Sequence, residues 1–335
     1  MKTKSLLTII ALLPVLFSCG GSSSSPSTPG SVPGKVPSTG GPREIVAVVA
    51  NELFSDSLTA VLQEELSPSL YGMPQAENET KLYIIPATNF NNLYQAHHSL
   101  VFVDKTDSIP EIKNALNVYS APQQIVSLKV NDYLELRKIL QGRSQEIIRK
   151  FLDADITTLQ HKLSRIAHSR IKYVDDLGVN MTIPNYYRPV MAHEDFVWLL
   201  KDIKKGKHLG TVNILIYKYP INDDDSYVDQ ISLRDSITKK YVHGEMPGSY
   251  MEIEKNYYPL SVETELGNMF AIESRGLWRT NGDFMGGPFI NYTMWDDETN
   301  TIYGIDGFVY FPSQDKSQYI FELEALLKTF QISGR

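Results

Sequence analysis

Residues Asn268 to Phe311 read NMFAIESRGLWRTNGDFMGGPFINYTMWDDETNTIYGIDGFVYF, and this stretch decides the fold class of the chain. It is rich in aromatic and β-branched residues, which predicts three strands, at Asn268–Trp278, Phe289–Trp295 and Thr301–Phe311. Turn-forming residues at Asp296–Asn300 separate the last two strands and predict a hairpin. Strands that follow one another through short turns are typical of an antiparallel sheet.

The segments before and after this stretch add helices to the predicted sheet. Leu58, Val61, Leu62 and Leu66 have helical spacing after a strand at Glu44–Ala50. Asp132 and Glu135 form a capping box that starts a helix, which Gly142 is expected to interrupt. Other helices are predicted at Ser144–Val174, at Val228–Val242 and after a cap at Asp315, and other strands at Lys81–Pro86, Ser99–Asp104, Gln124–Val130, Phe196–Leu200, Val212–Tyr219 and Ser249–Glu254.

This order of elements predicts a mixed α+β fold, with mainly antiparallel sheets and packed helices. We divide the chain into a signal peptide at residues 1–18, an anchor and tether at 19–42, and a globular part at 43–335. Each half of the globular part, 43–200 and 201–335, can be described as a strand, a helix, several strands and a helix. The sequence therefore raises the possibility of two similar halves, although no residue-level repeat supports it.

The N-terminus has the pattern of an exported, lipid-anchored protein. A basic tip at Met1–Lys4 precedes the apolar run Ser5–Phe17, which is too short to span a membrane and is typical of a signal peptide. Leu16-Phe17-Ser18-Cys19 follows and resembles the lipobox of bacterial lipoproteins, with Phe17 bulkier than the usual small residue. The resemblance implies cleavage before Cys19 and acylation of that residue, including palmitate. Two or three acyl chains would give stable attachment to membrane lipid.

The segment that follows Cys19 predicts a flexible tether. Gly20 to Pro42 is a Gly/Ser/Pro tract with almost no residue to bury, and its root-mean-square span would be about 25–30 Å. The whole chain of 335 residues carries a formal charge of −7 and contains one cysteine. The acidic balance, without a basic and aromatic cluster, argues against nucleic acid as a partner. A single cysteine excludes an internal disulfide.

The most unusual local chemistry lies between residues 273 and 289. If the segment is a strand, Glu273 and Arg275 share one face and could form an ion pair. One interpretation is a buried ion pair followed by a Gly-Gly-Pro turn; the other is a ligand cleft with an aromatic stacking wall, or a glycosidase carboxylate pair of Glu273 and Asp283. The candidate residues are Glu273, Arg275, Trp278, Arg279, Asp283, Gly286 and Gly287.

Other reactive signatures are weak. Asp223-Asp224-Asp225 and Asp296-Asp297-Glu298 lack the glycine and distal glutamate of an EF-hand loop, and we interpret both as acidic turns. Adjacent His97 and His98 would point to opposite faces of a strand, and no histidine set has zinc-site spacing. The sequence has no G-x-S-x-G, Walker or G-x-G-x-x-G motif, so we predict neither a cofactor nor a metal.

Several longer motifs resemble a family of Bacteroidota lipoproteins known as domain of unknown function 4837. The resemblance extends from Pro42 to the end, and its most specific part is Glu273-Ser274-Arg275-Gly276-Leu277-Trp278 followed by Asp283–Phe289. It departs from the family at Ser120 and at Lys316-Ser317. Other carrying motifs are Gly41–Val46, Leu70–Gln75, Tyr119–Gln124, Phe196–Leu199, Ile214–Pro220, Ser232–Ser236, Gly248–Met251 and Gly307–Tyr310. The resemblance implies an envelope location and a single conserved fold, and it transfers no catalytic residue.

These observations predict a lipid-anchored envelope protein that acts as a noncatalytic binding or scaffolding module. The expected location is the periplasmic side of the outer membrane. By resemblance to surface-exported Bacteroidota lipoproteins, an acidic cluster after the cysteine would direct the protein to the cell surface, and Gly20-Gly21-Ser22 lacks such a cluster. Its partner would be an envelope protein or a glycan. The alternative is a cell-wall or glycan hydrolase that uses Glu273 and Asp283.

Overall fold

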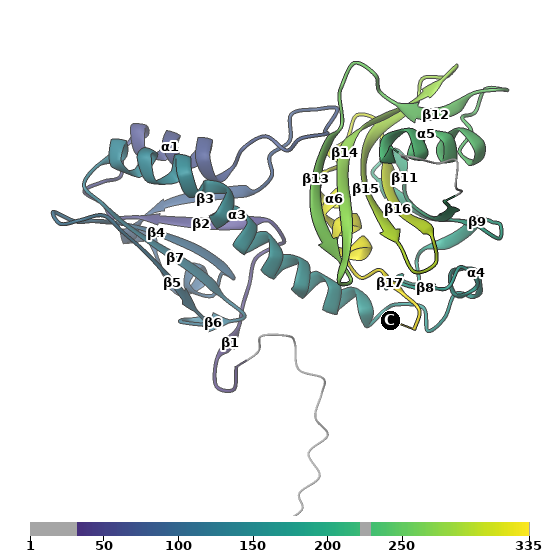
Figure 1. The fold of residues 1–335 in the computed structure, drawn as a ribbon. Coiled ribbons are helices and arrows are strands. Elements are labelled where there is room, and N and C mark those ends of the chain that lie inside the picture. The colour runs from purple at the N-terminus through teal and green to yellow at the C-terminus, as the bar shows by residue number, and fades with distance from the viewer. Residues whose placement is uncertain (1–31, 222–228, 335) are drawn as a thin grey trace, which may run out of the picture.

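The computed structural model describes residues 32–221 and 229–334 and confirms the α+β fold class (Figure 1). Two sheets dominate, each with its own helices, and the long helix α3 (Tyr133–Ser164) runs from one to the other. No helix in the described part of the chain is both long enough and apolar enough to cross a membrane.

The first sheet has five strands and is mostly parallel. Its order is β3-β2-β4-β7-β5, and only β5 runs antiparallel to its neighbour. Parallel strands need crossover connections, which α1 (Asp56–Leu66) and the segments around α2 (Asn92–Gln95) provide. The strand bounds are β2 Glu44–Val49, β3 Lys81–Pro86, β4 Ser99–Lys105, β5 Glu111–Leu116 and β7 Gln124–Val130.

One face of the first sheet is buried under α1 and α3. The alternating residues Ile45, Ala47 and Val49 of β2 point to these helices, together with Val101, Val103, Val126 and Leu128. A smaller apolar cluster lies on the opposite face, where Phe90 and Tyr94 partly cover Val46 and Leu100. The short 3-10 helix Ala87–Asn89 precedes this cover.

Residues 35–42, which we call the strap, pack beside the first sheet. β1 (Val36–Pro37) pairs in parallel with β6 (Ser120–Ala121), and Thr39 forms a bridge with His97. The Lys35 ammonium donates to the carbonyl of Val118 at 2.6 Å. The predicted tether therefore meets the folded body beside β1, at the edge drawn at the lower left of Figure 1.

The second sheet is antiparallel throughout. Its order is β12-β14-β15-β16-β11-β10-β9, and β13 also pairs with β14. The predicted hairpin at residues 296–300 is confirmed, because β15 and β16 pair from Asp296 opposite Thr301. The strand bounds are β9 Arg188–Ala192, β10 Phe196–Lys205, β11 His208–Pro220, β12 Tyr250–Ile253, β13 Leu260–Leu266, β14 Met269–Asn281, β15 Gly286–Asp296 and β16 Thr301–Tyr310.

Different helices cover the two faces of the second sheet. One face packs on α6 (Ser317–Leu327), the end of α3 and α4 (Lys172–Asp176). The other packs on α5 (Gln230–Tyr241) through Leu233, Ile237 and Tyr241. The small sheet of β8 (Val179–Asn180) and β17 (Gln331–Ile332) closes the chain.

Two helix predictions were wrong, and the predicted helix Ser144–Val174 was too long, because α3 ends at Ser164 and the separate α4 begins at Lys172. Gly142 does not interrupt α3, which continues to Ser164; a helix of that length spans about 48 Å, and packing along both sheets outweighs the propensity cost of one glycine. Asp315 does not cap α6. Glu77 accepts hydrogen bonds from the backbone N–H of Lys316 and Ser317 at 2.7–2.9 Å, so the cap comes from a distant loop. The Asp132 cap is confirmed by its bond from the Glu135 N–H at 2.9 Å.

The two sheets do not share a strand order, which contradicts the idea of similar halves at 43–200 and 201–335. That boundary falls inside β10, which pairs with β11 along its whole length. The transition between the sheets instead falls at the end of α3.

Candidate functional site

Glu273 and Arg275 lie on the face of β14 that packs on α6, where they form the buried ion pair predicted from their spacing. The Arg275 Nε donates to Glu273 Oε1 at 2.6 Å, and Arg275 Nη2 lies 2.7 Å from Glu324 Oε2. Tyr292 OH donates to the other oxygen of Glu273 at 2.7 Å. All four side chains are at least largely buried, so this cluster joins β14, β15 and α6.

Glu324 is the most strongly perturbed carboxylate of this cluster. Burial alone would raise its pKa, but the charges of Arg275 and Lys328 outweigh burial and lower the pKa to about 2. Lys328 Nζ donates to Glu324 Oε1 at 2.8 Å. The carboxylate therefore stays ionised and bound to cations, which suits a structural role.

The remaining candidates from the sequence do not join this ion pair. Arg279 bonds Glu252 of β12 at 2.8 Å, and Trp278 lies on the opposite face, in the apolar cluster under α5. Asp283 lies in the turn after β14. From Glu273 to Asn281, near the strand's end, an extended strand covers about 26 Å. The proposed glycosidase pair is therefore contradicted, because its carboxylates would need to lie about 5–10 Å apart.

Gly286 and Gly287 belong to β15 and not to a turn, so the Gly-Gly-Pro turn was also wrong. A Cβ at Gly287 would lie 2.0 Å from the carbonyl oxygen of Val309, and one at Gly286 would lie 3.0 Å from that of Trp278. Gly282, with φ +82°, takes the left-handed position of the real turn. The glycine pair is required for close approach of the strands.

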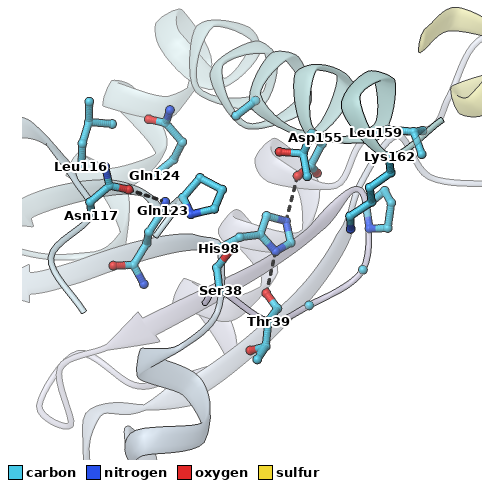
Figure 2. Close-up of a pocket in the computed structure, with 16 residues that line it drawn as sticks. Ser38, Thr39, His98, Leu116, Asn117, Gln123, Gln124, Asp155, Leu159 and Lys162 are labelled. Carbon is cyan, nitrogen blue, oxygen red and sulfur yellow. Dashed lines mark hydrogen bonds and ion pairs between the residues drawn. The ribbon is translucent and has the colours of Figure 1, made fainter. Parts of the chain in front are cut away.

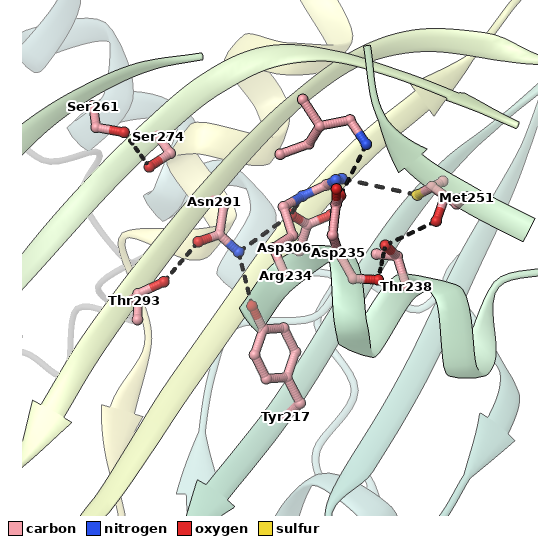
Figure 3. A network of polar contacts seen from close by, with 11 residues as sticks. Tyr217, Arg234, Asp235, Thr238, Met251, Ser261, Ser274, Asn291, Thr293 and Asp306 are labelled. Carbon is pink, nitrogen blue, oxygen red and sulfur yellow. Dashed lines mark hydrogen bonds and ion pairs between the residues drawn. The ribbon is translucent and has the colours of Figure 1, made fainter. Parts of the chain in front are cut away.

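A buried polar network lies under α5 on the other face of the sheet (Figure 3). Arg234 of α5 donates to both oxygens of Asp306, at 2.6 and 3.2 Å, and both side chains are fully buried. The guanidinium also lies 3.8 Å from the ring centroid of Phe289. Asn291 Nδ2 donates to Asp306 Oδ2 and to Tyr217 OH, each at 3.2 Å. The network fixes α5 to the sheet.

Beyond the C-terminal end of α5, the same face of the sheet is open. A cavity of about 350 Å³ lies there, within the size range of small-molecule sites. We call it the aromatic pocket. Its walls include Trp198 and Leu200 of β10, Trp278 of β14, and Phe308 and Tyr310 of β16.

Most polar groups in the floor of the aromatic pocket bind one another, and the buried Nε1 of Trp278 has no hydrogen-bond partner. Trp198 Nε1 donates to Asn213 Oδ1 at 3.0 Å, and Asn213 Nδ2 donates to Thr211 Oγ1 at 2.9 Å. The Met285 N–H donates to Thr280 Oγ1 at 3.0 Å, and that hydroxyl donates back to the Met285 carbonyl. The floor therefore offers a ligand mainly apolar and aromatic surface.

Two loops form the mouth of the aromatic pocket, and Asp283 holds them together. Its Oδ2 accepts from the N–H of Glu245 at 2.8 Å and of Met246 at 3.3 Å, and its Oδ1 accepts from the N–H of Phe284 at 2.7 Å. These backbone bonds lower the pKa of Asp283, with the Phe284 N–H as the largest cause. Asp283 therefore stays ionised and holds the two loops of the mouth together.

A second cavity, of about 250 Å³, lies between the strap and α3 (Figure 2). His98 Nδ1 donates to the Thr39 carbonyl at 2.8 Å, and His98 Nε2 lies 3.0 Å from Asp155 Oδ1. Asp155 Oδ2 also accepts from the Arg43 N–H at 2.7 Å. We call this set the histidine clasp, because it joins the strap, β2 and α3.

The two histidines do not point to opposite faces, as the sequence predicted, because they precede β4 instead of lying in it. Their rings stack at 4.6 Å. Burial and the neighbouring His98 lower the pKa of His97 to about 4. For His98, burial would lower the pKa, but Asp155 and the Thr39 carbonyl outweigh it and raise the pKa. Because both nitrogens of His98 already face acceptors, the clasp has no free base and is a structural joint.

Neither the acidic turns nor the anchor predicted at Cys19 provides a candidate site among the described residues. Asp296 accepts from the Glu298 N–H at 3.0 Å and from Thr299 Oγ1 at 2.7 Å, as expected for a turn. Asp223–Asp225 and Cys19 lie outside the described ranges. Within residues 32–221 and 229–334, no three His, Cys, Asp or Glu side chains are close enough together to hold a metal ion.

Sequence reasoning found Trp278 but missed the rest of the aromatic pocket. Trp198 and Asn213 come from the hairpin strands β10 and β11, whereas Phe308 and Tyr310 come from β16, far along the chain. One sequence feature could have indicated the pocket. Trp198, Leu200 and Asp202 alternate along a predicted strand, so they share one face on which large apolar side chains lie next to a polar one. Without the strand order, that alternation does not show which strands meet.

Comparison with known proteins gives families without an assigned activity. No curated protein matches the chain. Among solved structures, a protein from Bacteroides thetaiotaomicron matches with 11% identity and a TM-score of 0.26, over 48% of this chain and 47% of its own. The chain thus spans about half the length of that structure. LpqN of Mycobacterium tuberculosis, described as involved in cell envelope biogenesis, matches with 9% identity, a TM-score of 0.28 and coverage of 46% and 83%.

A variant of the protein Mog1 also matches, with 6% identity, a TM-score of 0.29 and coverage of 46% of this chain and 90% of its own. Residues 167–329 match the family model described as domain of unknown function DUF4837, which confirms the resemblance for the second sheet. Residues 38–164 match a different model, DUF8532, so the expected extent of the first resemblance was too large. The chain therefore consists of two segments that meet at the end of α3, each similar to an uncharacterised domain family.

Proposed function

We propose that this protein is a lipid-anchored, noncatalytic binding module of the cell envelope, with the aromatic pocket as its ligand site. The observation that carries the proposal is the pocket itself, an open cavity of about 350 Å³ with an aromatic floor beyond the end of α5. Its acidic residues Asp202 and Glu245 lie at exposed positions, whereas its floor is aromatic. That distribution suits the retention of a ligand better than proton transfer.

The proposed anchor is acylated Cys19, on the periplasmic side of the outer membrane. The strap makes the folded body begin beside β1, whereas β12 lies toward the other end of the molecule (Figure 1). Met251 of β12 lines the pocket. A tether that joins the body at one end leaves the pocket directed away from the membrane. This arrangement supports a role in holding or presenting a partner from the envelope.

Labelling with palmitate tests the anchor. The native chain should incorporate the label and fractionate with membranes, and Cys19→Ala should lose both properties. Proteinase treatment of intact cells should leave the protein uncut, whereas the same treatment after outer-membrane permeabilisation should cut it. Cleavage in intact cells would overturn the periplasmic orientation.

Site-specific photocrosslinking in native envelopes tests the ligand site. A benzoylphenylalanine in place of Phe284, which is fully exposed at the pocket mouth, should give a defined adduct. The matched control replaces Ile109, which is 87% exposed beside the first sheet, and should give none. The adduct at position 284 should disappear when Leu200→Arg places a charge in the pocket wall. Equal adducts at both positions would contradict the proposal.

A further inference from the structure

The aromatic pocket can be assigned a ligand class, and this assignment rests on the proposed binding function. Its floor polar groups, Asn213, Thr211 and Thr280, already have partners within the protein. A sugar carries a hydroxyl on most of its carbons, and nearly all of them would lose hydration without gaining a partner there, since Trp278 Nε1 is the one buried side-chain donor of the described lining residues that lacks a partner. The floor is therefore poorly suited to the glycan considered from the sequence and well suited to a hydrocarbon.

The mouth of the pocket extends this apolar surface to the solvent. Leu209 lines the cavity and is 67% exposed, and Met246 and Phe284, which are 57% and 103% exposed, are the chain neighbours of the lining residues Glu245 and Met285. Exposed large apolar side chains next to an apolar cavity are a feature of sites that bind apolar partners. A hydrocarbon longer than the cavity would remain in contact with protein as it emerges.

The hairpin between β10 and β11 lies at the same end of the sheet, because Thr211 pairs with Tyr310 and both line the pocket. It carries Lys204, Lys205 and Lys207, all exposed. Lys204 follows Trp198, Leu200 and Asp202 at alternate positions, so it lies on the pocket face of β10. This is a local concentration of cations in a chain of formal charge −7.

The acidic groups at this end compensate only part of that positive charge. Asp202 pairs with Arg188 of β9 at 3.2 Å, whereas Asp283 keeps its negative charge, with three backbone N–H groups bound to it. Glu245 is the remaining carboxylate among the pocket-lining residues. His243 and His208 add positive charge only when protonated. The mouth therefore complements an anion placed just outside an apolar cavity.

We propose that the aromatic pocket binds the hydrocarbon chain of a single-chain anionic amphiphile, a fatty acid, with its carboxylate at the β10–β11 hairpin, near Lys204 on the pocket face and Lys207 in the turn. The chain lies against Trp198, Leu200 and Tyr310, and the head group stays in water at the hairpin. Burial of methylene groups provides the affinity, and the lysines provide selectivity for a negative head group.

The test uses the mature chain with Cys19→Ser, so that its own acyl chains and detergent are absent. A dansyl-labelled undecanoate serves as the fluorescent probe, and competitors of equal chain length but different head group displace it. Dodecanoate should displace the probe at least tenfold more effectively than dodecyltrimethylammonium, and N-acetylglucosamine should not displace it. Octanoate should be weaker than dodecanoate, because each buried methylene contributes to affinity.

Two sets of variants separate the chain from the head group. Lys204→Glu, Lys205→Glu and Lys207→Glu together should weaken dodecanoate roughly tenfold, an effect that high salt reduces. The matched control makes the same change at three exposed lysines in and around the first sheet, Lys81, Lys129 and Lys138, and should leave the affinity for dodecanoate unchanged. Leu200→Arg, or Met285→Trp as a second variant that fills the cavity, should abolish binding while the thermal transition is retained.

The outcomes distinguish this inference from the proposed function. If dodecanoate does not bind, or if it binds equally to the Leu200→Arg and Met285→Trp proteins, the fatty-acid assignment is overturned. Should the cationic amphiphile or the sugar bind instead in a pocket-dependent way, the assignment fails while the binding module stands. If position 284 gives no photoadduct and none of the tested ligands binds, both the fatty-acid assignment and the proposed binding function are overturned.

Discussion

The two faces of the second sheet differ in how completely they are covered. On the α6 face, Arg275 joins Glu273 and Glu324, and the helix covers the cluster. On the α5 face, Arg234 and Asp306 form an equally buried pair under the helix, but the helix ends at Tyr241 and the sheet beyond it is open. The same sheet therefore has one closed face and one face that is closed only in part.

This comparison shows that unusual local chemistry and an available site need not coincide. The acid and arginine motif that attracts attention in the sequence lies on the closed face, where it stabilises packing. The open surface contains side chains that are ordinary one by one, such as Trp198, Leu200 and Tyr310. Availability depends on where a helix ends, and the following experiments test that distinction.

The largest expected effect is on the covered part of the α5 face. Arg234→Ala should lower the free energy of unfolding by about 3–5 kcal/mol, because it leaves the fully buried Asp306 without its cation. Denaturant unfolding measures the change. The double variant Arg234→Met with Asp306→Leu should recover a large part of the loss, and a single variant without effect would show that the pair is not buried as described.

On the closed face, low pH should lower the free energy of unfolding through protonation of Glu324. Its pKa is lowered to about 2 from an ordinary value of 4.5, so the unfolded chain binds the proton more readily. The stabilisation is present above about pH 4.5 and is lost as the pH falls toward 2, by up to about 3 kcal/mol. Glu324→Gln should remove this part of the pH dependence, as measured by chemical unfolding between pH 2 and 6. An unchanged acid profile would contradict the assignment.

Loss of the helix cap that Glu77 provides for α6 should have a smaller effect on stability. Glu77→Ala removes the acceptor for the N–H groups of Lys316 and Ser317 and should cost about 1–2 kcal/mol. Asp315→Ala is the matched control. It should have little effect, since Glu77 and not Asp315 accepts those bonds. A larger loss for Asp315→Ala would reverse the assignment of the cap.

The smallest stability effect belongs to the open part of the α5 face. Phe284→Ala should change the free energy of unfolding by no more than about 0.5 kcal/mol, because the ring is fully exposed. Ligand binding should nevertheless weaken several-fold in the dansyl-undecanoate assay. If stability falls while binding is unchanged, Phe284 is part of the packing and not of the mouth.

Much of the local structure could be predicted from the sequence, and the candidate site could not. The strands, the hairpin at 296–300, the Asp132 cap and the sharing of a face by Glu273 and Arg275 follow from two-residue and 3.6-residue periods. The expected break at Gly142 and the cap at Asp315 were wrong, because tertiary contacts outweighed local preference. The pocket brings together strands separated by loops and helices, and no local period encodes that order.

By itself the sequence determined the α+β class, the element positions and the predicted anchor at Cys19, since each depends on residues that are close together in the chain. Only the tertiary structure decided which helix covers which face, that Glu77 reaches a helix start 239 residues away, and that His98 joins Thr39 to Asp155. The physical reason is that burial is shared between elements. A side chain's environment is set by whatever packs against it, and that partner is chosen by the fold as a whole.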